Sequence, residues 1–174
     1  MIKRGILFGS FYLMALLVNA ASVYSQTNYK FEAIYIYSFT KYLSWPDNTI
    51  KNQFVVGIYG YSPMQQELVS VTNGKSVGDK SISVKSCNTL EEIENCQILF
   101  VSTEYEGDLP ELTKIANAKH ILLITDGNEM SGKGAGINLV NVDGKQKFEL
   151  NEAAVKKAGL KISNQLIPLA ILVK

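Results

Sequence analysis

Three short apolar runs, separated by segments with helical spacing, most constrain how this chain can fold. They are residues 54–60 (FVVGIYG), 97–102 (QILFVS) and 120–125 (HILLIT). Runs of this length that are apolar throughout are typical of strands buried on both faces, as in parallel sheets. Their alternation with helices predicts an α/β sandwich in which helices cover both faces of a mostly parallel central sheet.

The remaining segments extend this pattern to a single domain with a C-terminal β-hairpin. Residues 81–85 alternate as a strand does, and residues 137–142 and 145–150 flank Asp143-Gly144, a strong hairpin signal. Helices are expected from Ser62-Pro63, after Thr89, and over residues 108–118 and 152–158, with Met64, Leu68 and Val69 buried by the first of these. A last helix is expected after Ser163, kinked at Pro168, with Leu166, Leu169, Ala170 and Val173 turned inward.

The first residues of the chain have the layout of a secretory signal peptide. Lys3 and Arg4 precede an uncharged apolar run over residues 5–18, and small residues follow. Cleavage after Ala20 or after Ser25 fits the small-residue rule, and we favour Ser25. The apolar run is shorter than the roughly 20 residues of a membrane-spanning helix. We therefore expect residues 1–25 to be removed, and residues 26–174 to form a periplasmic domain with no membrane insertion.

The charge of the expected mature chain argues against a nucleic-acid partner. The full chain has 17 basic and 16 acidic residues, and residues 1–25 hold two of the basic and none of the acidic ones. The mature net charge is therefore about −1, with no basic run to neutralise phosphates. The same balance gives no electrostatic reason for binding anionic lipid.

Two cysteines, Cys87 and Cys96, leave two structures open. An even count in an exported protein favours a disulfide, whereas two separate buried thiols would be a purely structural alternative. A straight helix between them would span roughly 10 Å, and a bridge needs Cα atoms within about 7 Å. Spacing alone does not decide between the two.

The usual catalytic and metal patterns are not formed by these residues. The single histidine, His120, opens an expected buried strand and has no evident partner for acid–base work. The glycines of residues 132–136 lack the Lys-Ser/Thr ending of a phosphate loop and lead into a strand. The acids Glu91, Glu92, Glu94 and Glu104 fit a solvated face better than a catalytic pair. We therefore expect no enzyme activity, no cofactor and no metal.

Aromatic residues crowd the expected first helix, residues 29–43. Phe31, Ile34, Tyr35, Ser38, Phe39 and Tyr42 follow helical spacing along one face, which we expect to be buried. Tyr37 lies off that stripe, and exposed aromatic side chains favour interfaces. Tyr37 is therefore a candidate for contact with a partner.

In their order along the chain, several segments resemble the YfiR-like family of periplasmic regulatory proteins. The segments are KFEAIYIYSFTKYLSWP, GKSVGDKSISVKS, CQILFVS, GINLVNVDGKQKFELN and LKISNQLIPLA. The resemblance covers nearly all of residues 29–173. It implies a non-catalytic protein that binds the periplasmic part of a membrane diguanylate cyclase, restrains cyclic di-GMP synthesis and so affects biofilm formation. A sensor histidine kinase is an alternative target.

The resemblance also implies particular residues. Trp45-Pro46 matches the family's Trp-Pro after the first helix, Cys96 its cysteine before the third strand, and Phe148, Glu149 and Asn151 its hairpin end. Trp45, Phe148 and Glu149 therefore join Tyr37 as expected partner-binding residues. The chain departs from the family in having no cysteines around residues 136–140, and Cys87 does not match the usual partner of Cys96. A homodimer and a periplasmic protein that binds a small ligand are further expectations to be tested.

Overall fold

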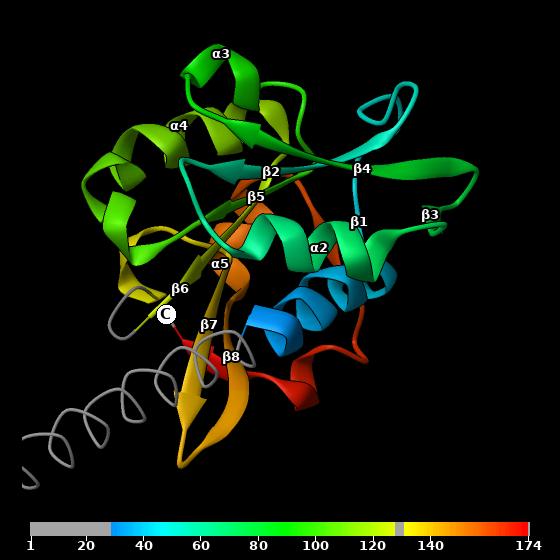
Figure 1. Ribbon diagram of the computed structural model, residues 1–174. Helices are drawn as coiled ribbons and strands as arrows, with labels where there is room; N and C mark the ends of the chain where they lie inside the picture. Colours follow the sequence, from blue (N-terminus) through cyan, green and yellow to red (C-terminus); the bar gives the residue numbers. More distant parts are fainter. Residues whose placement is uncertain (1–28, 128–130, 174) are drawn as a thin grey trace, which may run out of the picture.

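An eight-stranded sheet crosses the domain in the order β10-β8-β7-β6-β5-β2-β4-β3 (Figure 1). The computed structural model describes residues 29–127 and 131–173. Five neighbouring strands run parallel, and β3, β8 and β10 run opposite to them. The predicted α/β fold with a mostly parallel sheet is confirmed. The strands are β2 (Phe54–Tyr59), β3 (Ser76–Val77), β4 (Lys80–Cys87), β5 (Ile98–Val101), β6 (Leu122–Asp126), β7 (Ile137–Val142), β8 (Lys145–Asn151) and β10 (Ile171–Val173).

Helices cover both faces of this sheet, and the strand side chains alternate between them. The helix over residues 29–42 and α2 (Met64–Thr72) lie on one face, whereas α3 (Leu90–Ile93) and α4 (Leu109–Lys119) lie on the other (Figure 1). In β5, Phe100 faces the first pair of helices, and Leu99 and Val101 face the second. All three are fully buried, which explains why this strand is apolar throughout.

The remaining elements are short. A two-stranded sheet pairs β1 (Leu43–Ser44) with β9 (Lys161–Ile162). The helix α5 (Glu152–Lys157) is capped by Asn151, whose side chain accepts a hydrogen bond from the Ala154 amide as expected for a cap. The 3-10 turns are η1 (Thr103–Asp108), η2 (Ser131–Lys133) and η3 (Ile167–Leu169).

The β7–β8 hairpin forms where it was predicted. Asp143 and Gly144 connect the strands with φ values of 53° and 75°. Positive φ at both central residues is what a two-residue hairpin turn of the favoured twist requires, and Asp-Gly tolerates it. The hairpin positions Phe148 under the first helix.

The buried face of the first helix differs from the predicted one. Glu32, Ala33, Ile36, Phe39, Thr40 and Leu43 are buried, whereas Phe31 and Ile34 are 53% and 43% exposed. The smaller Ala33 and Ile36 let the helix lie close to the sheet, while the hydroxyl of Tyr35 reaches outward to donate to the carbonyl of Gln146 (3.2 Å). The predicted buried face, which was chosen for its aromatic residues, is therefore wrong.

The predicted last helix is also wrong. After Leu166 the chain makes only the turn η3 and then extends as β10, parallel to β8. Pro168 lacks an amide hydrogen and cannot sit inside a longer helix without losing a hydrogen bond. As a result Leu169 is 60% exposed, although helical spacing predicted it to be buried.

Two smaller predictions also need correction. His120 does not begin a strand; it ends α4 in the left-handed conformation (φ 59°), and its Nδ1 lies 2.9 Å from the carbonyl oxygen of Ala158. Val69 is half exposed on α2, where Thr72 is buried instead.

Candidate functional site

An apolar groove of about 280 Å³ lies between the first helix and the C-terminal segment. Ile34 on the helix and Leu169 in η3 form exposed sides of this groove. Phe39, Phe148 and Leu166 form a buried floor. The full lining is Ile34, Tyr35, Ser38, Phe39, Tyr42, Phe148, Leu166 and Leu169. Only the hydroxyl-bearing side chains contribute polar atoms, so the groove suits an apolar group.

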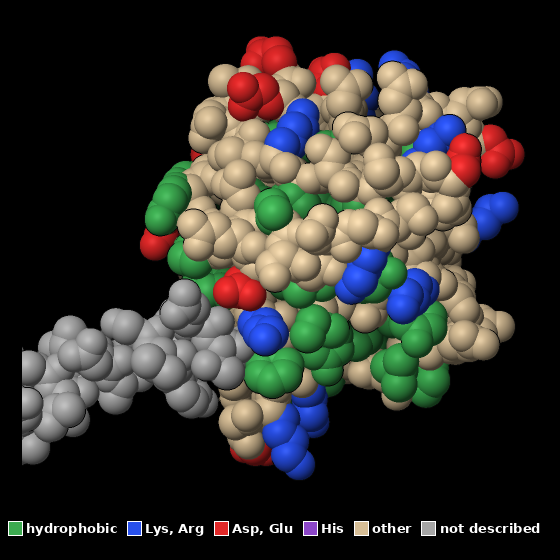
Figure 2. Space-filling view, turned by 45° about the vertical axis from the view of Figure 1, so that its right-hand side comes forward, with side chains coloured by type: hydrophobic (Ala, Val, Ile, Leu, Met, Phe, Trp, Pro, Cys, Tyr) green, Lys and Arg blue, Asp and Glu red, His purple; other side chains and the backbone are tan. Residues whose placement is uncertain are grey.

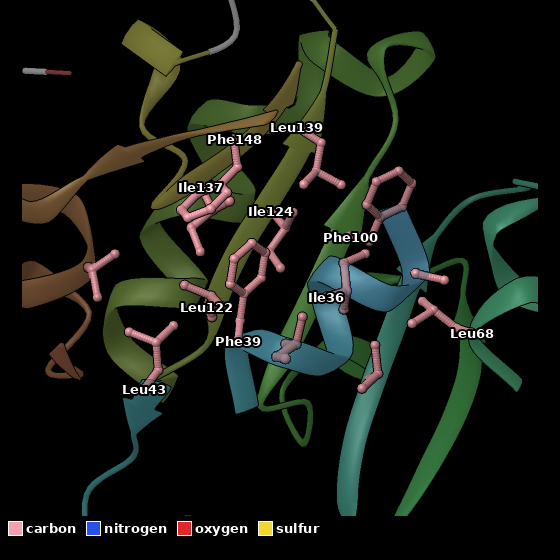
Figure 3. Packing of buried hydrophobic residues seen from close by; sticks show 14 of the residues in the cluster. Ile36, Phe39, Leu43, Leu68, Phe100, Leu122, Ile124, Ile137, Leu139 and Phe148 are labelled. Atoms are coloured by element: carbon pink, nitrogen blue, oxygen red, sulfur yellow. The ribbon is translucent and has the colours of Figure 1, made fainter. Parts of the chain in front are cut away.

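Three aromatic rings hold the floor of the groove in place. The Phe39 and Phe148 ring centroids are 5.0 Å apart in an edge-to-face arrangement, and Tyr35 lies 5.7 Å from Phe148. Figure 3 shows Phe39 on the helix and Phe148 on the hairpin extending into the same buried cluster. Such contacts favour one arrangement of the rings, so the groove is preformed.

Exposed apolar side chains continue beyond the groove. Phe31 lies one helical turn from Ile34, and Leu172 is 54% exposed on β10. Leu172 pairs with Leu150, and paired residues point to the same face, which here is the face of the first helix. We call Phe31, Ile34, Leu169 and Leu172 the apolar patch. Hydrophobic side chains gather visibly on the lower part of the surface in Figure 2.

The residues predicted to contact a partner lie in four different environments. Tyr37 is half-buried beneath two cations, with the Lys41 and Lys75 Nζ atoms 4.9 Å and 4.3 Å from its ring centroid. Trp45 is half-buried against Phe54 (4.9 Å between centroids) and donates from Nε1 to the carbonyl of Gln97.

The hairpin residues point to opposite faces. Phe148 is 2% exposed, so the expectation that it offers an accessible side chain to a partner is wrong; it supports the groove from below. Glu149 is half-buried and accepts a hydrogen bond from Nδ2 of Asn138 (2.8 Å) on the other face of the sheet. The structure does not bring Tyr37, Trp45 and Glu149 into one site.

Sequence reasoning missed Ile34, Leu169 and Leu172 because it assigned them to buried stripes or gave them no role. The signal that could have found the C-terminal pair is Pro168. A proline at the third position of a short apolar segment predicts that the segment extends, and an extended edge segment exposes alternate side chains.

The two thiols lie side by side in the opposite face of the sheet. Their Sγ atoms are 3.9 Å apart, both side chains are buried, and the thiols are not bonded in this structure. A Cβ on Gly57 would lie 2.6 Å from Sγ of Cys96 and 3.1 Å from Sγ of Cys87, so the pair fills the space above a glycine. The contact with Cys87, together with burial, raises the pKa of the Cys96 thiol. The Cys96 thiol is therefore held in its uncharged form.

Two general features follow from the residues that the structure describes. Within residues 29–127 and 131–173, no group of three or more His, Cys, Asp or Glu side chains is placed to hold a metal ion. In the same ranges, no helix combines the length and the apolar character needed to cross a membrane.

The model of a family described as YfiR/HmsC-like matches residues 29–171. No curated protein matches the chain. Because the family model spans the sheet, the first helix and both sides of the groove, this chain belongs to the YfiR/HmsC-like family.

Proposed function

We propose that this protein is a periplasmic regulator that binds the periplasmic part of a membrane diguanylate cyclase through the apolar patch and restrains the enzyme. The patch supplies the contact surface, and the groove accepts an apolar side chain of the partner. A sensor histidine kinase is the other target class that suits the same mode of action.

Family membership supports the outline of this proposal. YfiR/HmsC-like proteins are periplasmic and regulatory rather than catalytic, and the family is associated with diguanylate cyclase signalling through a protein partner. A regulator of this kind needs an accessible recognition surface and no reactive groups. The identity of the partner in this case is part of our proposal.

The apolar patch is the observation that carries the proposal. Leu169 and Leu172 are more than half exposed, and Ile34 is 43% exposed. Apolar side chains that are clustered at the surface mark interaction sites, whereas single ones do not. A preformed groove, lined by the patch residues Ile34 and Leu169, lowers the ordering cost of binding.

The size of the groove favours a protein partner over a small ligand. Ligand pockets for drug-sized molecules usually enclose about 300–1,000 Å³ and have several convergent polar groups. This groove is smaller, at about 280 Å³, and is open along an apolar rim. One inserted Leu, Phe or Met side chain would fill such a space, with the surrounding patch covered by the rest of the partner.

Binding to the partner's purified periplasmic domain, measured by calorimetry, tests the proposal. Leu169→Asp places a charge at the groove, and we expect it to weaken binding by about 2 kcal/mol or more, as at an interface hot spot. Val69→Asp is the matched control because Val69 is 50% exposed on α2, outside the groove. Equal affinities for the two variants, with unchanged melting temperatures, would move the interface elsewhere.

Localisation is tested separately. We expect protein recovered from the periplasmic fraction to begin near Gln26, and intact-mass measurement gives the N-terminus directly. A cytoplasmic species that retains Met1 would contradict both export and the proposed site of action.

A further inference from the structure

Two surface hollows, each of about 450 Å³, adjoin at Asn48, which lines both of them. The first, which we call the tryptophan hollow, lies between Trp45 and the β3–β4 turn at residues 77–80. The second, which we call the amide hollow, lies between residues 48–53 and the segment before β5 that includes Gln97. β3 and β10 are at opposite ends of the strand order, and no residue of the apolar patch lines either hollow (Figure 1). Each volume is within the range of about 300–1,000 Å³ that is usual for ligand sites.

The indole of Trp45 gives the tryptophan hollow a fixed aromatic wall. Its ring meets the ring of Phe54 edge to face, with 4.9 Å between the centroids and an interplanar angle of 88°. Its Nε1 donates to the carbonyl of Gln97 at 3.0 Å. Trp45 is nevertheless only half-buried, so part of its surface is open to a ligand in the hollow. A ring already held in one orientation offers contact area with little further loss of side-chain freedom on binding.

The buried side chain of Gln97 holds the two hollows in a fixed relation. Its Oε1 accepts from the Val55 amide at 2.7 Å, and its Nε2 donates to the carbonyl of Thr49 at 3.1 Å. The amide and the hydroxyl of Thr49 in turn donate to the carbonyl of Pro46, at 3.3 Å and 2.8 Å. Gln97 therefore connects the indole of Trp45, the loop that follows it and the start of β2, and both hollows are preformed.

Charged side chains in the two hollows are largely engaged with one another. Lys80 pairs with Asp79 at 2.9 Å in the tryptophan hollow, and Lys119 pairs with Glu94 at 3.0 Å in the amide hollow. The tryptophan hollow has two lysines and two aspartates in its lining, so its charges balance. Neither hollow therefore offers concentrated charge to an ionic ligand.

Exposed hydroxyl and amide groups remain for recognition of a ligand. Ser44 and Asn48 line the tryptophan hollow, and the amide hollow adds Asn52, Gln53 and Asn95. All five side chains are exposed. Each has both a donor and an acceptor, so this lining suits a ligand whose polar atoms are mainly hydroxyl groups, which also donate and accept.

We propose that the two hollows bind an uncharged oligosaccharide. One pyranose ring lies against Trp45, and the following units cross Asn48 into the amide hollow. A pyranose ring with equatorial hydroxyls exposes C–H groups on its faces, and the electron-rich face of an indole attracts them. The hydroxyls at the ring edge pair with the side-chain amides. Because the site extends over two adjoining hollows, it suits a chain of sugars better than a single ring.

A fluorescence titration of the purified protein with cellotetraose, a linear and uncharged glucose oligomer, tests the site. Trp45 is the only tryptophan of the chain, so its emission reports the tryptophan hollow directly. We expect a saturable shift of the emission to the blue at millimolar sugar, because the sugar displaces water from the half-buried indole. Mannitol carries similar hydroxyls without a pyranose ring and should cause little change.

Asn48→Gly is the decisive variant because it removes the shared amide while keeping the backbone. Asn48 has a φ of 68°, a conformation that glycine adopts readily. We expect cellotetraose to bind about fivefold more weakly to this variant, since the hydrogen bonds of one side chain are lost. Asn88→Gly is the matched control, because Asn88 is exposed and lines neither hollow. Trp45→Ala would also remove the packing against Phe54 and is less clean.

Three results would overturn the proposal. They are an unchanged emission with cellotetraose, a response to mannitol as large as that to cellotetraose, or equal affinities of Asn48→Gly and Asn88→Gly for cellotetraose. Thermal melts of each variant show that it is folded. The titration uses no protein partner, so its outcome is independent of the proposed interface.

Discussion

The two halves of the sheet differ in how completely their apolar side chains are buried. In the parallel half, from β4 to β6, helices cover both faces, and every residue of β5 is buried. In the C-terminal half, β10 carries Ile171 and Leu172 at 36% and 54% exposure, next to the open groove. Stability is concentrated where the strands are fully covered, whereas recognition is expected where the pattern of helix and strand breaks down.

The sharpest test of this contrast is one substitution made in each half. Leu99→Ala removes a fully buried side chain from β5 and should lower the unfolding free energy by about 2–5 kcal/mol. Leu172→Ala removes a half-exposed one from β10 and should change it by about 0.5 kcal/mol or less. Chemical denaturation measures both values. Similar losses would show that the two halves contribute equally to the stability of the fold.

The first helix connects the two halves, and Glu32 makes its attachment depend on pH. The folded-state pKa of about 7 is above the ordinary value of 4.5, so the folded protein holds this proton more tightly. The resulting stabilisation is complete below about pH 4.5 and is lost as pH rises through 7. Glu32→Gln should therefore become more stable relative to the wild type by about 3 kcal/mol between pH 4 and pH 8.

Denaturant melts of both proteins across this pH range measure the difference. Glu91→Gln provides the comparison, because Glu91 is exposed and far less affected by burial. If the unfolding free energies of the wild type and Glu32→Gln differed by the same amount at every pH, the raised pKa of Glu32 would be contradicted.

Packing around the thiols tests how tightly the parallel half is filled. Gly57→Ala adds a Cβ 2.6 Å from Sγ of Cys96 and should cost about 1–3 kcal/mol through overpacking. Combining it with Cys96→Ala removes the sulfur, so the double variant should lose less stability than the two single losses together. If the two losses of stability simply added, the contact between the new Cβ at position 57 and Sγ of Cys96 would have to be relieved in another way.

The smallest expected effect concerns oxidation of the same pair. With two unbonded thiols in the core, adding a reductant should leave the melting temperature unchanged. The intact mass under non-reducing conditions should equal the dithiol value. A mass two units lower, with a melting temperature that falls in reductant, would instead establish a disulfide between Cys87 and Cys96.

Sequence patterns predicted the parallel half of the sheet and the β7–β8 hairpin well because their signals are local. The apolar runs, the helix start after Thr89 and the Asp143-Gly144 turn each depend on a few neighbouring residues, and all three appear as expected. The orientation of the first helix depended instead on how closely Ala33 approaches the sheet, a tertiary fact that periodicity does not contain.

The candidate site was harder to predict for the same reason. The groove combines the first helix, the hairpin and η3, which are more than 100 residues apart along the chain at their extremes. Phe148 was selected from the sequence and does line the groove, but as its floor. The exposure of Leu169 could have been predicted only by recognising that Pro168 limits this segment to a single turn.

Trp45 gives this protein a natural optical reporter. It is the only tryptophan of the chain, and it lies against Phe54 with its indole N–H bonded to the Gln97 carbonyl, outside the lining of the groove. Its fluorescence should therefore shift strongly to the red on unfolding, since solvent reaches the indole. Binding at the apolar patch should leave the emission nearly unchanged. An emission shift caused by a folded partner would place Trp45 itself within the contact surface.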